Sequence, residues 1–229
     1  MRKGFVAACV VACGWTSAAS ADIKVDIDSS NTNPVTTQAG FASFNAGSTA
    51  TDAQTVAPLT VDGVTFTLFG GLDGSRNRAL NATITGDPYE SLLRDFVFND
   101  ATSTTQGAGI GLRIEGLAVG VYDVQSFHYD AAANTSGSVQ IEVRDRDVAG
   151  STVILVDNAP FRPEPYAYQI EVTHPGQVLE LVFREDDSLD RSRLNGFIIA
   201  PAVPEPGTAA SLGALVGVLG AGRRRRRRR

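Results

Sequence analysis

The sequence predicts an all-β fold, an antiparallel β-sandwich or jelly roll, over residues 22–202. In residues 137–145 every second side chain is apolar, which is the pattern of a half-buried strand. Turn sequences rich in glycine, aspartate and proline separate many such segments. Only residues 88–95 read as a helical turn, so crossover helices that would join parallel strands are not expected. An immunoglobulin-like sandwich has the same strand content and stays open as the alternative.

Ten segments carry strand signals. In chain order they are residues 23–27, 59–69, 96–98, 110–114, 121–129, 137–145, 152–156, 166–172, 178–183 and 194–199. Residues 46–57 are rich in small polar side chains and are expected to form a surface loop. Ten short strands in a body of about 180 residues are enough for one sandwich with one core.

The N-terminus has the pattern of a secretory signal peptide over residues 1–21. Two basic residues precede an apolar stretch, and Ala19 and Ala21 form an A-x-A cleavage site before Asp22. We therefore expect passage through the Sec translocon and cleavage by signal peptidase. The residues before Cys13 loosely resemble a lipobox, so a lipoprotein cut at that cysteine is the alternative.

The body is strongly acidic. Residues 22–203 contain one lysine and ten arginines against 24 aspartates and glutamates, a formal charge of −13. Such a surface repels phosphate backbones, so no nucleic-acid partner is expected. Both cysteines lie in the leader, so the exported body has no disulfide and depends on its core for stability.

The C-terminal segment, residues 203–229, has three parts. A Pro-Glu-Pro tripeptide comes first, residues 207–222 are uncharged and include five glycines, and seven arginines follow. As a helix this stretch would reach about 24 Å, short of the roughly 30 Å of a bilayer core. It is therefore a marginal transmembrane helix, and the arginines would hold its end in the cytoplasm. The residues expected to act as the signal are Val203, Pro204, Glu205, Pro206, Arg223, Arg224 and Arg225.

This order of tripeptide, short apolar helix and arginine cluster resembles the PEP-CTERM sorting signal of Gram-negative bacteria. The resemblance implies that an exosortase in the inner membrane recognises the tail and processes the protein near the tripeptide. It also implies a transient inner-membrane stage and a final place at the cell surface or outside the cell, in company with extracellular polysaccharide. An ordinary C-terminal membrane tail and a nucleic-acid-binding polyarginine arm are the alternatives.

A second resemblance concerns the body. Residues 116–124 are similar to the G-L-x-x-G-x-Y-x-V strand-turn-strand motif of extracellular bacterial sandwich domains, in which Leu117 and Tyr122 would pack inward. With short motifs at residues 38–41, 94–98 and 194–198, the layout resembles a galactose-binding-like jelly roll. The resemblance implies sugar binding only by analogy of fold.

Catalytic residues are not evident in the sequence. His128 lies near a strand end with Ser126 on the same strand face, but no oriented base and no G-x-S-x-G elbow accompany them. We expect His128 to be a partly exposed strand residue, and we expect no enzymatic activity.

Two groups of carboxylates are candidates for calcium binding, the one cofactor that the sequence suggests. Asp26 and Asp28 point to the same side of the first strand, and Asp187 and Asp190 lie in a loop before the last strand. If the first and last strands are neighbours, these oxygens could meet around Ca²⁺. A solvated acidic loop balanced by nearby arginines is the alternative.

Aromatic side chains supply the remaining binding signal. Tyr129, Phe161, Tyr166 and Tyr168 fall near predicted strand ends or loops, where an exposed ring could stack on a sugar. Together with His128 the tyrosines are the candidate ligand residues, and core packing is the alternative.

These observations predict an exported, non-enzymatic surface or matrix protein with a structural or adhesive role. A carbohydrate-binding module, in which calcium could take part, is the alternative. A polysaccharide hydrolase or lyase is the third hypothesis.

Replacing Pro204 and Pro206 by alanine tests the sorting signal. Because the tripeptide is expected to be the recognition element, we expect the variant to accumulate at full length in the inner-membrane fraction. Fractionation and intact mass measure this outcome. If the variant is cut and released as the wild type is, the tripeptide is not recognised.

Overall fold

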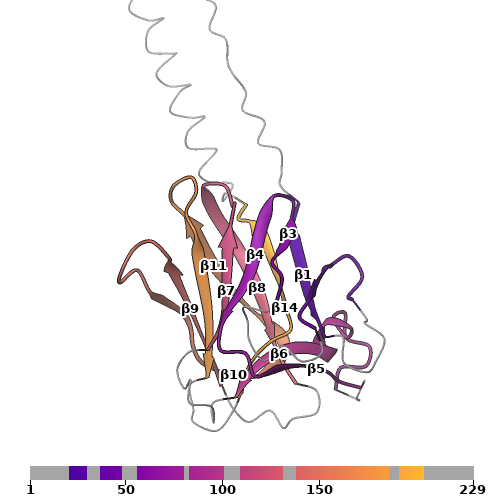
Figure 1. The fold of residues 1–229 in the computed structure, drawn as a ribbon. Helices are drawn as coiled ribbons and strands as arrows, with labels where there is room; N and C mark the ends of the chain where they lie inside the picture. Colours follow the sequence, from indigo (N-terminus) through magenta and orange to yellow (C-terminus); the bar gives the residue numbers. More distant parts are fainter. Residues whose placement is uncertain are drawn as a thin grey trace, which may run out of the picture.

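The structure is a computed structural model of the chain. It describes residues 21–29, 37–47, 56–79, 83–100, 109–130, 138–185 and 191–203. These residues form two facing β-sheets and a smaller third sheet across one end (Figure 1). The predicted all-β sandwich is confirmed. Residues 1–20 of the predicted leader, the tail beyond Val203, Asp187 and Asp190 lie outside the described residues.

One layer is a five-stranded sheet. Its strands, in pairing order, are β11 (Arg162–Val172), β8 (Gly120–His128), β14 (Gly196–Pro201), β1 (Ile23–Asp28) and β2 (Ala42–Asn45). The first and last strands pair antiparallel, with Ile23 opposite Ile199, so they are neighbours as expected. The β1–β2 pair is parallel and is an exception to the predicted antiparallel order.

The facing layer is a six-stranded antiparallel sheet. Its strands, in pairing order, are β10 (Val153–Pro160), β9 (Ser138–Asp145), β12 (Leu179–Glu185), β7 (Ile110–Glu115), β4 (Val64–Gly70) and β3 (Leu59–Val61). The strand expected over residues 59–69 is divided at Asp62 and Gly63, whose φ angles are 50° and 81°. Positive φ at both positions is the signature of a two-residue hairpin turn.

The third sheet has three strands and lies at one end of the sandwich (Figure 1). Its strands are β13 (Arg191–Leu194), β6 (Asp95–Asp100) and β5 (Gly74–Asn77). A 3₁₀ turn, η2 (Leu92–Arg94), precedes β6 and confirms the helical turn predicted in residues 88–95. Strand β5 was not predicted, because its residues GSRN contain no apolar side chain. Strand β2 was also missed, since only Phe44 in it is buried.

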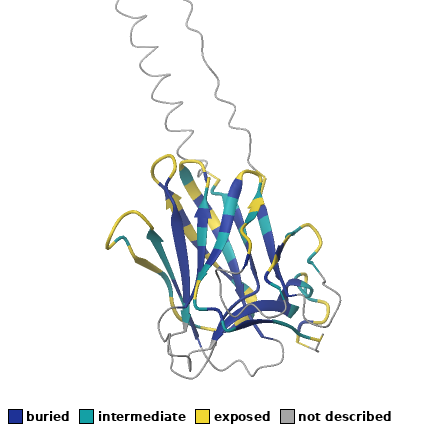
Figure 2. Ribbon diagram, in the orientation of Figure 1, coloured by how far each residue is buried: buried dark blue, intermediate teal, exposed yellow. Residues whose placement is uncertain are grey.

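The main core fills the space between the two larger sheets (Figure 2). The rings of Phe66 on β4 and Phe197 on β14 meet with centroids 5.0 Å apart, which joins the two layers directly. Leu117 and Tyr122 are both 8% exposed, as the strand-turn-strand motif predicted, and the Tyr122 hydroxyl donates to the Ala118 carbonyl.

A second apolar cluster covers the opposite face of the five-stranded sheet. Phe127 on β8 packs there with Leu92 and Leu93 of the 3₁₀ turn, and with Ile84 and Tyr129. This cluster attaches the segment before β6 to the sandwich. Within the described ranges, no helix has the length and apolar character needed to cross a membrane.

Asn195 joins the three-stranded sheet to the sandwich. It lies between β13 and β14 and is completely buried. Its side-chain amide donates to the carbonyls of Leu93, Asp95 and Tyr129, at 3.4, 2.9 and 3.0 Å, and its Oδ1 accepts from the Tyr129 amide at 2.7 Å. Its backbone N–H donates to Phe127, and its carbonyl accepts from Ile27.

Asn195→Ala is expected to lower the free energy of unfolding by about 2–4 kcal/mol, because it leaves one buried N–H and up to three buried carbonyls without partners. Urea denaturation measures the loss. Gln169→Ala is the control, since its amide makes an exposed hydrogen bond to Asp123 and should cost about 0.5 kcal/mol or less. Equal losses in the two variants would contradict the role given to Asn195.

Candidate functional site

The outer face of the six-stranded sheet carries two rows of side chains that cross its four central strands. This face is turned to the viewer in Figure 1, with β9, β7 and β4 labelled. From β9 to β4 the first row reads Glu142, Val182, Gly111 and Phe69, and the second reads Arg144, Glu180, Arg113 and Thr67. Three interstrand steps of about 4.8 Å give each row a span of about 14 Å.

The ring of Phe69 lies directly over the backbone of Gly111. A Cβ atom at position 111 would be only 2.4–2.5 Å from three ring carbons, so no other residue type leaves room for the ring in this place. A glycine covered by a cross-strand aromatic ring is a known way to restore packing on a sheet. The result is a partly exposed aromatic ring held close against the sheet.

Glu180 holds two arginines in fixed positions beside this ring. Its carboxylate, 4% exposed, accepts from Arg113 at 2.8 and 3.1 Å through Oε1 and from Arg144 at 2.7 Å through Oε2. The guanidinium carbons of Arg113 and Arg144 lie 5.4 and 5.8 Å from the centre of the Phe69 ring. Charge-assisted bonds of this kind fix both the place and the plane of a guanidinium.

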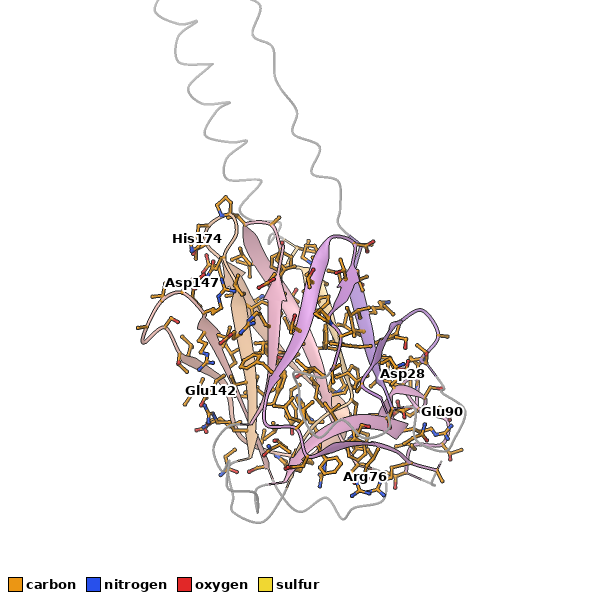
Figure 3. The ribbon with its side chains drawn as sticks, viewed as in Figure 1. Asp28, Arg76, Glu90, Glu142, Asp147 and His174 are labelled. Carbon is orange, nitrogen blue, oxygen red and sulfur yellow. The ribbon has the colours of Figure 1, made fainter. Side chains whose placement is uncertain are left out.

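This face combines an aromatic ring with ordered hydrogen-bond donors. An aromatic ring offers an apolar surface, and ordered guanidinium N–H groups donate to hydroxyl or carboxylate oxygens. Arg113 and Arg144 are 31% and 40% exposed, so their remaining donors reach solvent. Glu142, paired with Arg184 at 3.2 Å, adds acceptor oxygens at the margin (Figure 3).

The expectation that the tyrosine rings are exposed is wrong. Tyr129, Tyr166 and Tyr168 are only 3%, 6% and 9% exposed. Strand β11 begins at Arg162, earlier than predicted, so Tyr166 and Tyr168 lie within it and alternate toward the core. Tyr166 donates to the Pro160 carbonyl and Tyr168 to Ser126 Oγ at 3.2 Å, and burial raises the pKa of both phenols.

His128 is completely buried rather than partly exposed. Its Nδ1 lies 2.5 Å from the Arg193 carbonyl, which can only accept, so Nδ1 carries the proton and Nε2 accepts from Ser126 Oγ at 2.8 Å. Burial lowers the pKa of His128 to about 4, which keeps the ring neutral. Ser126 is equally enclosed, so no substrate reaches this serine–histidine contact.

Asp26 and Asp28 point to the same side of β1, as predicted, and both are buried. Asp26 accepts a hydrogen bond from the backbone N–H of Gln38 at 2.6 Å, and Asp28 accepts one from the Thr37 hydroxyl at 2.8 Å. In the structure, the carboxylate that lies near Asp26 and Asp28 is the fully buried Asp95 of β6. Among the described residues, no group of three or more aspartate, glutamate, histidine or cysteine side chains is arranged to hold a metal ion.

Burial is the main reason that the pKa of Asp26 is raised to about 8 and that of Asp95 to about 7, and the negative charge of Asp28 contributes to both. The hydrogen bond from the backbone N–H of Gln38 to Asp26, and the positive charge of Arg94 near Asp95, act in the opposite direction. Asp26 is therefore largely protonated at neutral pH, and Asp95 is about half protonated.

Three residues of the predicted processing sites are described, and they lie at the surface. Ala21 and Asp22 are exposed before β1, and Val203 is 85% exposed after β14. Ala19, Pro204, Glu205, Pro206 and the arginines from Arg223 onward lie outside the described residues.

Sequence reasoning missed the residues of the outer face. The alternation in residues 59–69 places Phe69 on the side opposite Leu68, and that signal was available. That Phe69 meets Gly111, and that Glu180 lies between Arg113 and Arg144, depends on the pairing of β4, β7, β12 and β9.

No protein-family profile and no curated protein matches this chain. Among solved structures, a Bacillus subtilis protein is similar over 81% of this chain at 18% identity, with a TM-score of 0.43, and this chain spans 41% of its length. The CBM22-1 xylan-binding domain from Paenibacillus barcinonensis is similar over 67% of this chain and 91% of its own, at 12% identity and a TM-score of 0.37. A Bacteroides uniformis β-glucuronidase is similar over 80% of this chain and 18% of its own, at 11% identity and a TM-score of 0.42.

The buried carboxyls make stability depend on pH. Their folded pKa values, about 8 and about 7, lie above the ordinary value of 3.8, so the unfolded chain releases protons that the folded chain keeps. Their contribution to stability is complete below about pH 4 and is lost as the pH rises to about 8. Asp26→Asn should therefore raise the free energy of unfolding at pH 8 by about 1–3 kcal/mol and change it little at pH 4.

Urea denaturation between pH 4 and pH 8 measures this difference. Asp123→Asn serves as the control, because Asp123 lies exposed on β8. A pH dependence of stability that is the same in wild type and Asp26→Asn would contradict the assignment.

Proposed function

We propose that this chain is an exported surface protein whose β-sandwich binds polysaccharide through the outer face of the six-stranded sheet. The observation that carries the proposal is the Phe69 ring held over Gly111 beside two guanidinium groups that Glu180 fixes. Binding to extracellular polysaccharide is also the means by which a structural or adhesive matrix protein would act.

The geometry suits an extended sugar chain better than a small molecule. The two rows run across the strands over about 14 Å on an open sheet surface. One face of a pyranose ring is apolar and can lie on Phe69, while its hydroxyls accept from Arg113 and Arg144. Because Glu180 already orders both arginines, little side-chain entropy is lost on binding.

Export and surface display belong to the same proposal. The leader would bring the body through the Sec translocon, and the C-terminal signal would hold it briefly in the inner membrane for an exosortase. The start of β1, after Ala21, and the end of β14, before Val203, lie at the end of the sandwich opposite the three-stranded sheet (Figure 1). A chain tethered from that end would leave the outer sheet face free to meet polysaccharide.

Calcium binding by Asp26 and Asp28, with Asp187 and Asp190, is a subordinate part of the proposal. Asp26 Oδ1 and Asp28 Oδ1 are buried and have no hydrogen-bond partner, which is what a cation ligand would require before loading. Calcium that raised the unfolding midpoint of the wild type at pH 8, and not that of Asp26→Asn, would support this part.

Three variants test the binding face. Phe69→Ala removes the ring and should weaken polysaccharide binding about tenfold or more. Gly111→Ala keeps every functional group but pushes the ring off the sheet, and should weaken binding to a similar degree. Val121→Ala is the control, since Val121 is 40% exposed on β8 and belongs to the five-stranded sheet, away from the two rows.

Affinity electrophoresis of the full-length protein in mild detergent, through gels that contain dextran, galactan or alginate, measures the binding. Retention of the wild type by none of these polysaccharides would contradict the proposed function. Retention that Phe69→Ala and Gly111→Ala leave unchanged would remove the outer face as its site.

A further inference from the structure

The outer side of the three-stranded sheet carries a second arrangement of arginine and aromatic side chains. Phe96 and Phe98 of β6 lie on the side opposite Val97, which belongs to the main core. Arg76, on the neighbouring strand β5, lies at the end of the sandwich far from His174 and from the described chain ends (Figure 3).

Arg76, Phe98 and Gly74 form a stack. The ring of Phe98 lies against Gly74, where a Cβ atom would meet two ring carbons at 3.0 Å. The guanidinium carbon of Arg76 lies 4.9 Å from the centre of the same ring. Phe98 is 7% exposed, so the arginine rests on a nearly buried aromatic surface that sets the plane of its guanidinium.

Arg78, which follows the end of β5, is a nearby arginine whose guanidinium has an acceptor. Arg78 donates to both carboxylate oxygens of Asp130, at 2.9 and 2.8 Å, and its guanidinium carbon lies 5.8 Å from the Phe96 ring. Its carbonyl accepts from Arg94 Nε at 2.8 Å. Arg78 is therefore a structural residue.

Arg76 has no such acceptor. Its Nε is buried and makes no hydrogen bond, and its guanidinium has no ion pair with any of the described residues. A charged donor without an acceptor costs free energy, and an oxygen bound to the terminal N–H groups of Arg76 would give this guanidinium an acceptor. Nothing in the packing of Phe98 requires a guanidinium, because any apolar stem would cover the ring.

We propose that Arg76 is the anion-binding residue of a second ligand site, which takes a carboxylate group of an acidic polysaccharide. The proposal rests on the proposed function, since it names a ligand class for the same kind of partner. A planar guanidinium pairs with a carboxylate through two parallel hydrogen bonds, and Phe98 holds it in the plane that this pairing needs.

The surroundings favour a polymer with one carboxylate per sugar unit over a more densely charged polyanion. The body carries a formal charge of −13, and Asp130 lies beside the neighbouring arginine. A chain with two or more sulfate groups per unit meets more of this repulsion than a polyuronate, whose single carboxylate per unit can meet one cation at short range.

Two sites on different faces would let one molecule hold two polysaccharide chains. Phe69 lies on the outer face of the six-stranded sheet, and Arg76 lies on the sheet that crosses the end of the sandwich. Cross-linking of this kind would give a matrix role without any catalytic step.

The test measures binding of full-length protein in mild detergent to sodium alginate, a polyuronate, by isothermal titration calorimetry. Arg76→Gln should raise Kd about tenfold, and Arg76→Lys should recover only part of the loss because an ammonium cannot pair in a plane. Dextran sulfate in place of alginate shows whether a sulfate serves instead of a carboxylate.

Arg162→Gln is the matched control. Its guanidinium carbon also lies over an aromatic ring, 4.4 Å from the centre of Tyr166, and the substitution removes the same charge. Unlike Arg76, Arg162 already donates to an acceptor, the Pro165 carbonyl at 3.3 Å. Equal losses in Arg76→Gln and Arg162→Gln would show a general charge effect and overturn the proposal, as would unchanged affinity in Arg76→Gln.

The result separates this site from the first one. If the wild type binds dextran or galactan but neither alginate nor dextran sulfate, the second site is overturned and the first is not. If the wild type binds dextran sulfate more tightly than alginate, the preference of the second site for a carboxylate is overturned. Alginate binding that falls in Arg76→Gln and is unchanged in Phe69→Ala supports the second site without the first. Binding to none of the four polymers overturns both.

Discussion

The whole arrangement depends on how one buried amide, that of Asn195, is satisfied. A single segment of chain leaves the three-stranded sheet as β13 and enters the sandwich as β14 one residue later. Backbone N–H and C=O groups at such a junction cannot all form the regular interstrand hydrogen bonds of either sheet. Without another partner they would be buried and unsatisfied. Asn195 supplies donors and an acceptor to Leu93, Asp95 and Tyr129 at once, and so fixes three chain segments in one place. The position of β6, and with it of Phe96 and Phe98, follows from this.

The candidate binding face depends on register in the same way. Phe69 finds a glycine beneath it only because β4 and β7 pair with Phe69 opposite Gly111. A slip of one residue would place Leu112 there and turn Phe69 toward the core. The strand pairing that builds the core therefore also determines which outward side chains meet, and Glu180 can hold two arginines from two different strands only in this alignment.

The sequence predicted the parts of the fold that have local causes. Alternating residues such as Val139 and Ile141 identified strands. The single strand expected over residues 59–69 is instead a hairpin that turns at Asp62 and Gly63. Strand β5 could not be predicted, because its residues are placed by pairing with β6 and not by their own apolar character. The tyrosines were expected near strand ends, but β11 is longer than its alternation indicated and encloses Tyr166 and Tyr168. The contacts on the outer face of the six-stranded sheet could not be predicted from the sequence, since they join residues from four strands.

The placement of arginines explains how so acidic a body could hold an anionic or neutral chain. At distances beyond about 8–10 Å the net charge of −13 repels anions, although salt screens that repulsion. Arg76, Arg113 and Arg144 each lie over a ring within 6 Å, where they are held in one orientation and attract only a group already in contact. Attraction at these faces is therefore short in range and directional. It selects partners by shape and hydrogen-bond geometry, which is how a protein recognises an extended sugar chain rather than a densely charged one.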